Sequence, residues 1–155
     1  MSETARRLDL YASTERDYGF TFWAVVNRET GALIGDCGLA PREWRGPEIE
    51  VGYRIARSHW GRGLATEATL ASLEAGFEHF DLPEIFGRTK RRNTPSRRVM
   101  EKAGMEYVGL PRLGGSRWAM YRATREGWEG GARHARHAVG GSRYGATRME
   151  PGRLD

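Results

Sequence analysis

The chain of 155 residues has little of what marks a secreted or membrane protein. Cys37 is its single cysteine, so no disulfide can form within the chain, and a reducing compartment is expected. No run of the sequence approaches the roughly 18 apolar residues of a membrane-spanning helix, and the N-terminus "MSETARRLDL" lacks the apolar core of a signal peptide. These absences favour a cytoplasmic protein without a membrane partner, of a length that suits one domain.

Positive charge is in excess and is distributed unevenly along the chain. The formal net charge is +5, and residues 130–155 contribute +3 of it, from five arginines less Glu150 and Asp155. This segment is rich in glycine and has almost no large apolar side chain to bury, so we expect a disordered basic tail after a domain over residues 1–129. A basic tail is one means of contacting RNA or a ribosome surface. Because the aromatic residues do not cluster beside the basic runs, the sequence does not favour nucleic acid as the main partner.

Apolar periodicity predicts a mixture of strands and helices. Alternating apolar residues over 49–56 indicate a strand with one buried face, and apolar residues three and four apart over 64–80 indicate a helix that packs on a sheet. Asn93 or Thr94 as N-cap and Gly104 as the stop bound a second helix. We also expect a short helix over 4–12, a hairpin of strands over 20–26 and 32–39, and strands over 84–90, near 105–109 and over 117–123. This order predicts an α/β or α+β domain with a mixed sheet.

The stretch "HWGRGLATEA", residues 59–68, places two glycines at a turn that runs from a strand into a helix. One interpretation is that Gly61 and Gly63 are needed for unusual backbone dihedral angles. The other is that they leave the first amides of the helix open to a phosphate, because those amides have no partner within the helix and the helix dipole adds positive potential. Arg57 and Arg62 add charge nearby. The spacing matches neither a Walker loop nor a dinucleotide fingerprint.

The run "EVGYRIARSHWGRGLATEA", followed about thirty residues later by "NTPSRRVMEKAGM", resembles the GNAT acetyltransferases. It is most similar to the branch that acetylates the N-termini of ribosomal proteins. The family's turn reads Arg/Gln-x-x-Gly-x-Gly/Ala, and residues 60–65 occupy its six positions, with Trp60 departing from the general pattern. The resemblance implies a mixed, mostly antiparallel sheet flanked by helices, with acetyl-CoA as the co-substrate.

The same resemblance implies which residues bind the co-substrate. Its pyrophosphate would lie against the amides of residues 61–66, with the Thr66 hydroxyl as a further donor, and a backbone amide near 53–56 would stabilise the oxyanion. Asn93 would hold the pantetheine arm, although capping its own helix is the alternative and the two roles can coexist. The expected cofactor-binding residues are Tyr53, Ile55, Trp60, Gly61, Arg62, Gly63, Leu64, Ala65, Thr66 and Asn93.

Two residues are candidates for catalysis. Glu50 faces away from its neighbours Ile49 and Val51, on the strand that resembles the family's substrate-facing strand, and we expect it to be the general base. Glu48 is the second candidate for this role, and a plain surface position is the alternative for Glu50. The resemblance implies that Ser96 hydrogen-bonds or protonates the departing sulfur, whereas its alternative is an ordinary polar residue in a first helix turn. No metal site is expected, because two histidines in the tail are too few ligands.

Acetyl transfer needs an uncharged amine, which favours one class of acceptor. An α-amino group titrates near pH 8 and a lysine near 10.4, so at pH 7 about a tenth of the former and about one in 2,500 of the latter is free base. We therefore expect a protein N-terminal amine as acceptor, with small amines or amino acids next. The resemblance implies a first strand and a first helix before the hairpin, and we expect this chain to be an N-terminally truncated form of the fold that lacks them. A catalytically inactive CoA-binding domain is therefore an alternative to the enzyme, as is an RNA-associated protein acting through its tail.

Overall fold

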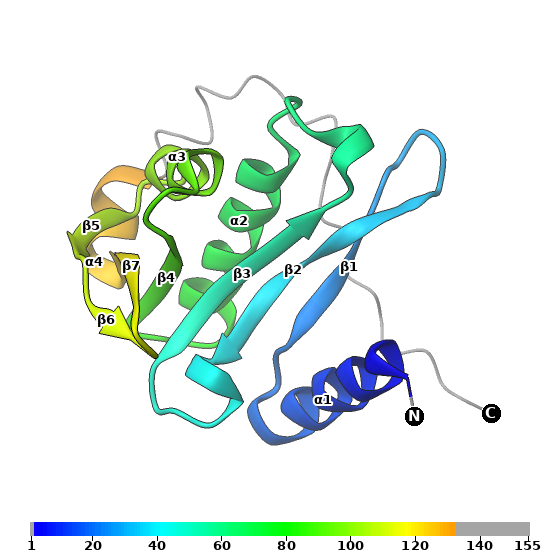
Figure 1. Cartoon of the computed structure of the whole chain (residues 1–155), viewed down its shortest axis with the longest axis horizontal. Helices are drawn as coiled ribbons and strands as arrows, with labels where there is room; N and C mark the ends of the chain where they lie inside the picture. The colour runs from blue at the N-terminus through cyan, green and yellow to red at the C-terminus, as the bar shows by residue number, and fades with distance from the viewer. Residues whose placement is uncertain (1, 133–155) are drawn as a thin grey trace.

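The computed structural model describes residues 2–132 (Figure 1). The expected tail beyond residue 132, with its two histidines, lies outside this part of the chain. Residues 130–132, which we expected to belong to the disordered tail, instead continue a helical turn, η4 (Trp128–Ala132). This turn follows α4 (Arg125–Gly127) and is held by the buried Trp128, whose ring centroid lies 5.7 Å from that of Phe77.

A helix, α1 (Glu3–Tyr18), precedes the first strand. The prediction of a short helix over 4–12 was wrong in length, because α1 has 16 residues. Ser2 caps its N-terminus by accepting a hydrogen bond from the amide of Ala5. Gly19 ends it in the left-handed region at φ 81°, the conformation that glycine adopts without strain.

The remaining elements follow the predicted order. The strands are β1 (Phe22–Val26), β2 (Leu33–Pro41), β3 (Ile49–Ile55), β4 (Glu84–Lys90), β5 (Glu106–Gly109), β6 (Arg112–Leu113) and β7 (Ser116–Thr124). The helices are α2 (Leu64–Glu74), which continues as the π-helical turn η3 (Ala75–His79), and α3 (Thr94–Lys102); short 3-10 turns are η1 (Arg42–Trp44) and η2 (Arg57–His59). The two-residue strand β6 was not predicted, because it is too short to show an alternating pattern.

The strands form one sheet in the order β1-β2-β3-β4-β7-β5, with β6 beside β7. All of these neighbours are antiparallel except β3 and β4, which are parallel and share a single registered pair, Glu50 with Phe86. Beyond that pair the two strands diverge, and the sheet opens between the carboxyl ends of β3 and β4 (Figure 1). The predicted fold class, a mixed and mostly antiparallel sheet flanked by helices, is confirmed.

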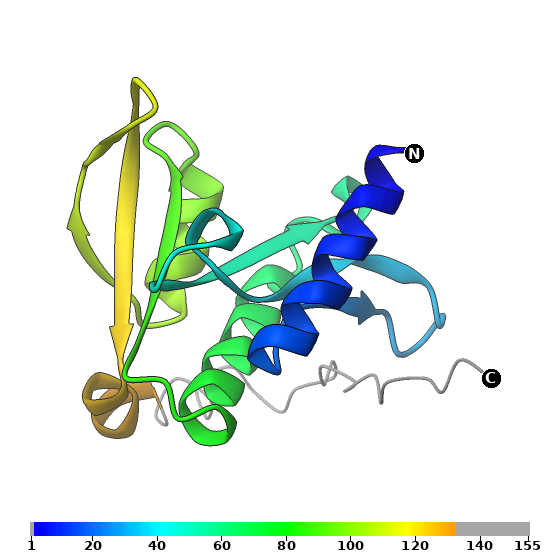
Figure 2. The same cartoon turned by 90° about the horizontal axis from the view of Figure 1, so that it is seen from below.

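Helices cover the two faces of the β1-β2-β3 part of the sheet. Helix α2 packs on one face, where Leu39, Leu73, Phe77 and Ile85 belong to the buried core, and α1 lies on the other face (Figure 2). Cys37 lies under α2, and its sulfur is 3.3 Å from the Ser72 hydroxyl. Complete burial raises the pKa of this thiol to about 12, so it stays protonated and uncharged at neutral pH. Within residues 2–132 no helix is long and apolar enough to cross a bilayer.

Candidate functional site

The turn between β3 and α2 has both of the properties that the sequence allows as alternative interpretations of its two glycines. Gly61 lies at φ 76° and Gly63 at φ 74°, so both adopt the left-handed region that strains other residues. A Cβ added at either position would meet no atom within 4 Å, so the space in front of the backbone is open. The dihedral angles therefore demand glycine, and the same glycines leave the turn accessible to a ligand.

The start of α2 offers amide groups to this open space. Gly63 is the N-cap residue and provides no side-chain cap, and the amide of Glu67 is the one that bonds back to the Gly63 carbonyl, at 3.0 Å. The amides of residues 64–66 precede it in the first turn of the helix, where an amide has no carbonyl acceptor within the helix. The buried Leu64 side chain fixes this end of the helix on the core. The turn thus has the geometry of an anion site.

The outer edge of β3 borders the opening in the sheet. The amide of Ala56 donates to Ile34 of the neighbouring β2, at 2.7 Å. Because alternate residues of a strand direct their backbone groups to the same side, those of Tyr53 and Ile55 point away from β2, toward the opening. The Ile55 carbonyl accepts a hydrogen bond there from the indole Nε1 of Trp60, at 2.7 Å. This edge can pair with an extended ligand, and Trp60 connects it to the glycine turn.

Tyr53 and Ser96 meet beside the opening, at the first turn of α3. The Tyr53 hydroxyl lies 2.8 Å from the Ser96 hydroxyl and donates to the Ser96 carbonyl at 2.8 Å. Burial raises the pKa of Tyr53 to about 12, so the phenol keeps its proton. Asn93 accepts from the amide of Ser96 at 3.2 Å, which is the capping role named as its alternative. Sequence reasoning missed the pairing of Tyr53 with Ser96, because 43 residues separate them.

Glu50 lies on the opposite face of β3 from Tyr53, since the two are three residues apart on one strand. Its side chain is 15% exposed and accepts from two arginines: Arg42 Nε at 2.8 Å and Arg88 Nε at 3.2 Å. Arg42 also pairs with Glu48, the second candidate for the base. Neither arginine was expected here. Arg88 belongs to the basic run of residues 88–92.

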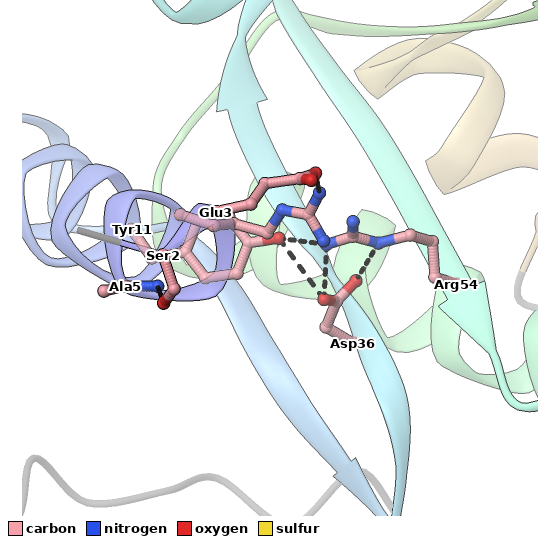
Figure 3. Close-up of polar contacts among 7 residues, drawn as sticks. Ser2, Glu3, Ala5, Tyr11, Asp36 and Arg54 are labelled. Atoms are coloured by element: carbon pink, nitrogen blue, oxygen red, sulfur yellow. Dashed lines mark hydrogen bonds and ion pairs between the residues drawn. The ribbon is translucent and has the colours of Figure 1, made fainter.

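An aromatic and charged contact network attaches α1 to the face that carries Glu50. The guanidinium of Arg54 on β3 donates to both Asp36 oxygens, at 3.0 and 2.6 Å, and also contacts the Tyr11 hydroxyl (Figure 3). Tyr11 donates to Asp36 at 3.3 Å, and its pKa is raised by burial and by that carboxylate. Its ring centroid lies 5.5 Å from both Phe22 and Trp44. These contacts hold helix α1 against the face of the sheet that also carries Glu50.

Within residues 2–132, no group of three or more histidine, cysteine, aspartate or glutamate side chains lies close enough to hold an ion. The candidates for function are the open turn, the edge of β3, and the polar groups on the two faces beside the opening.

Comparison with known proteins identifies this arrangement. Residues 1–106 match the acetyltransferase (GNAT) domain family. The chain belongs to the GNAT family. Among its relatives is the protein YkkB of Bacillus subtilis, which is 37% identical over 94 residues, 60% of this chain and 55% of YkkB. The GNAT chain thus spans about half the length of the curated relatives it matches.

Solved structures show the same GNAT fold. An acetyltransferase from Agrobacterium tumefaciens superposes with a TM-score of 0.69 at 28% identity, covering 79% of this chain and 71% of that one. The ribosomal-protein-S5-alanine acetyltransferase of Vibrio fischeri superposes with a TM-score of 0.66 at 19% identity, over 80% of this chain and 71% of that chain. At this low identity the second likeness concerns the fold alone.

Proposed function

We propose that this protein transfers an acetyl group from acetyl-CoA to a primary amine, by direct attack of the amine on the thioester. The observation that carries the proposal is the open glycine turn at the start of α2, next to the free edge of β3, in a chain that belongs to the GNAT family. Acetyl-CoA is the co-substrate of that family. The proposed reaction forms no covalent intermediate on the enzyme.

The diphosphate of acetyl-CoA binds the turn of residues 60–66, where open amides and the helix dipole favour an anion. Arg62 and the Thr66 hydroxyl add charge and a donor. The pantetheine arm follows the free edge of β3 at Tyr53 and Ile55, as a further strand would, and the amides there stabilise the charge that develops on the thioester oxygen. Asn93 remains a candidate for holding the arm while it caps α3.

The two proton transfers of the reaction take place on opposite faces of β3. The amine approaches on the Glu50 face, its nitrogen bonds to the thioester carbon, and its proton passes to Glu50 directly or through water. The carbon–sulfur bond breaks on the Ser96 face, where the Ser96 hydroxyl hydrogen-bonds the leaving thiolate or protonates it. The Tyr53 hydroxyl lies 2.8 Å from that of Ser96, so it can pass its proton to the Ser96 oxygen as the Ser96 proton moves to sulfur, and Tyr53 then regains a proton from solvent.

A protein N-terminal amine is the acceptor that we favour. At neutral pH a far larger fraction of N-terminal amines than of lysine amines is uncharged. An N-terminal amine therefore needs less help from a general base, and Glu50 can serve as that base although it already pairs with Arg42 and Arg88. The acetyltransferase of Vibrio fischeri that shares the fold acts, by its name, on an alanine of ribosomal protein S5. Small amines and amino acids are the next candidates.

A catalytically inactive CoA-binding domain is the second candidate function, and one observation favours it. Both carboxylate oxygens of Glu50 already accept from guanidinium groups, which leaves fewer of its lone pairs for an amine or a water. One experiment separates the two functions. Calorimetric titration with acetyl-CoA should give saturable binding in either case, whereas free CoA thiol released in the presence of N-terminal peptide amines is expected of the enzyme alone. Absence of binding would refute both.

A further inference from the structure

Trp60 connects the two parts of the proposed acetyl-CoA site. It stands at the start of the glycine turn, and its indole Nε1 donates to the carbonyl of Ile55, the last residue of β3, at 2.7 Å. We propose that Trp60 is a positioning residue, which holds the diphosphate-binding turn at a fixed distance from the strand edge that binds the pantetheine arm. This inference rests on the proposed function.

The position of Trp60 does not follow from burial. The residue is 61% exposed, so the hydrophobic effect contributes little to keeping its ring against the strand. The Arg57 guanidinium lies 5.4 Å from the centroid of its ring and covers it. The hydrogen bond to Ile55 and this cation–π contact together orient an otherwise exposed indole.

The direction of the indole N–H argues against direct binding of a phosphate by Trp60. A donor in this turn could bind a phosphate oxygen directly, as the neighbouring amides are proposed to do. The N–H of Trp60 instead points to Ile55, whose carbonyl faces the opening between β3 and β4. The bond therefore connects the turn to the strand.

The turn needs such a connection because it is built from residues that allow motion. Gly61 and Gly63 flank the exposed Arg62, and no neighbouring atom lies within 4 Å of where their side chains would be. The backbone bonds of the preceding η2 turn are local, from His59 to Ala56 at 2.9 Å and from Trp60 to Arg57 at 3.1 Å. These bonds set the backbone conformation of η2, whereas the bond from the Trp60 indole to Ile55 fixes the position of the glycine turn relative to the end of β3.

A fixed spacing matters only to a ligand that contacts both parts. When two binding groups belong to one molecule, their affinities combine fully if the protein already holds the two subsites at the correct separation. Loosening the connection then weakens binding of the whole molecule and leaves the binding of each half unchanged. A direct contact between Trp60 and one half would weaken the binding of that half as well.

The test uses Trp60→Phe, which keeps an aromatic ring beneath Arg57 and removes the N–H. Three probes are titrated into the full-length wild type and variant: acetyl-CoA, ADP for the diphosphate half, and S-acetylpantetheine for the thioester half. We expect the Kd for acetyl-CoA to rise about two- to tenfold, the effect of one neutral hydrogen bond, and the Kd values for both halves to stay within about twofold. Amide hydrogen exchange at residues 61–66 should become faster in the variant without ligand.

Each other outcome overturns the inference in a recognisable way. An equal loss for ADP and acetyl-CoA would mean that Trp60 binds the diphosphate itself. Unchanged acetyl-CoA affinity and unchanged exchange at residues 61–66 would mean that the indole bond does not hold the turn. If wild-type protein binds none of the three probes, the proposed function fails, and the inference fails with it; faster exchange in Trp60→Phe would then show only a structural bond.

Discussion

Replacing Gly63 by alanine separates the backbone role of this glycine from its role in ligand binding. Gly63 lies at φ 74°, and a side chain in the left-handed region costs about 1–2 kcal/mol. No atom lies within 4 Å of the added methyl group, so no steric clash adds to this cost. Gly104, which follows α3 at φ 82° and also has nothing within 4 Å, provides a matched control away from the turn.

Both variants, Gly63→Ala and Gly104→Ala, should lose about 1–2 kcal/mol of unfolding free energy in denaturant titrations. Only Gly63→Ala should lose acetyl-CoA affinity, because its methyl group occupies the space in front of the amides. Loss of one charge-assisted hydrogen bond of about 1.5–3 kcal/mol corresponds to a rise in Kd of roughly ten- to 150-fold. Gly63→Glu should abolish binding, since it adds negative charge there. Equal acetyl-CoA affinity in Gly63→Ala and Gly104→Ala would refute the phosphate role of the turn.

Three further predictions concern the polar groups beside the opening. Glu50→Gln should lower kcat by about a hundredfold or more in a thiol-release assay, with acetyl-CoA affinity unchanged, and wild-type turnover would remove Glu50 as the base. Ser96→Ala should slow turnover about tenfold without changing KM for acetyl-CoA; if turnover is unaffected, Ser96 has only a structural role. Because the folded-state pKa of Tyr53 is raised to about 12, its contribution to stability is complete below pH 10 and is lost as pH rises from 10 to 12. Tyr53→Phe should therefore lose less unfolding free energy than the wild type between pH 10 and pH 12. An equal loss in the two proteins would contradict the raised pKa of Tyr53.

The elements that sequence reasoning placed correctly have strong local signals. The strand β3 alternates buried and less buried positions through Ile49 and Val51, and α3 begins at Thr94, directly after Asn93, whose side chain caps it. Helix α1 was predicted too short, because Thr14 is its only buried residue among those described and its sequence shows no continuous apolar stripe. Its caps, Ser2 and Gly19, were the signals that could have given its full length.

The functional site likewise contains parts formed by neighbouring residues of the sequence and parts formed by residues far apart in it. The glycine turn is continuous in sequence, so its conformation and openness could be predicted from its residues. The pairing of Tyr53 with Ser96 depends on how β3 and α3 pack, and the contacts of Glu50 with Arg42 and Arg88 depend on strand register. No local pattern encodes such contacts, because they form only when the sheet assembles.

The proposed function requires the main-chain amides at the start of α2 to bind the diphosphate of acetyl-CoA. The decisive measurement follows the backbone amide resonances of residues 61–66 while acetyl-CoA is added. Saturable shifts that concentrate on these amides, and that disappear in Gly63→Glu, are the predicted result. Shifts that saturate elsewhere while these amides stay unchanged would contradict it.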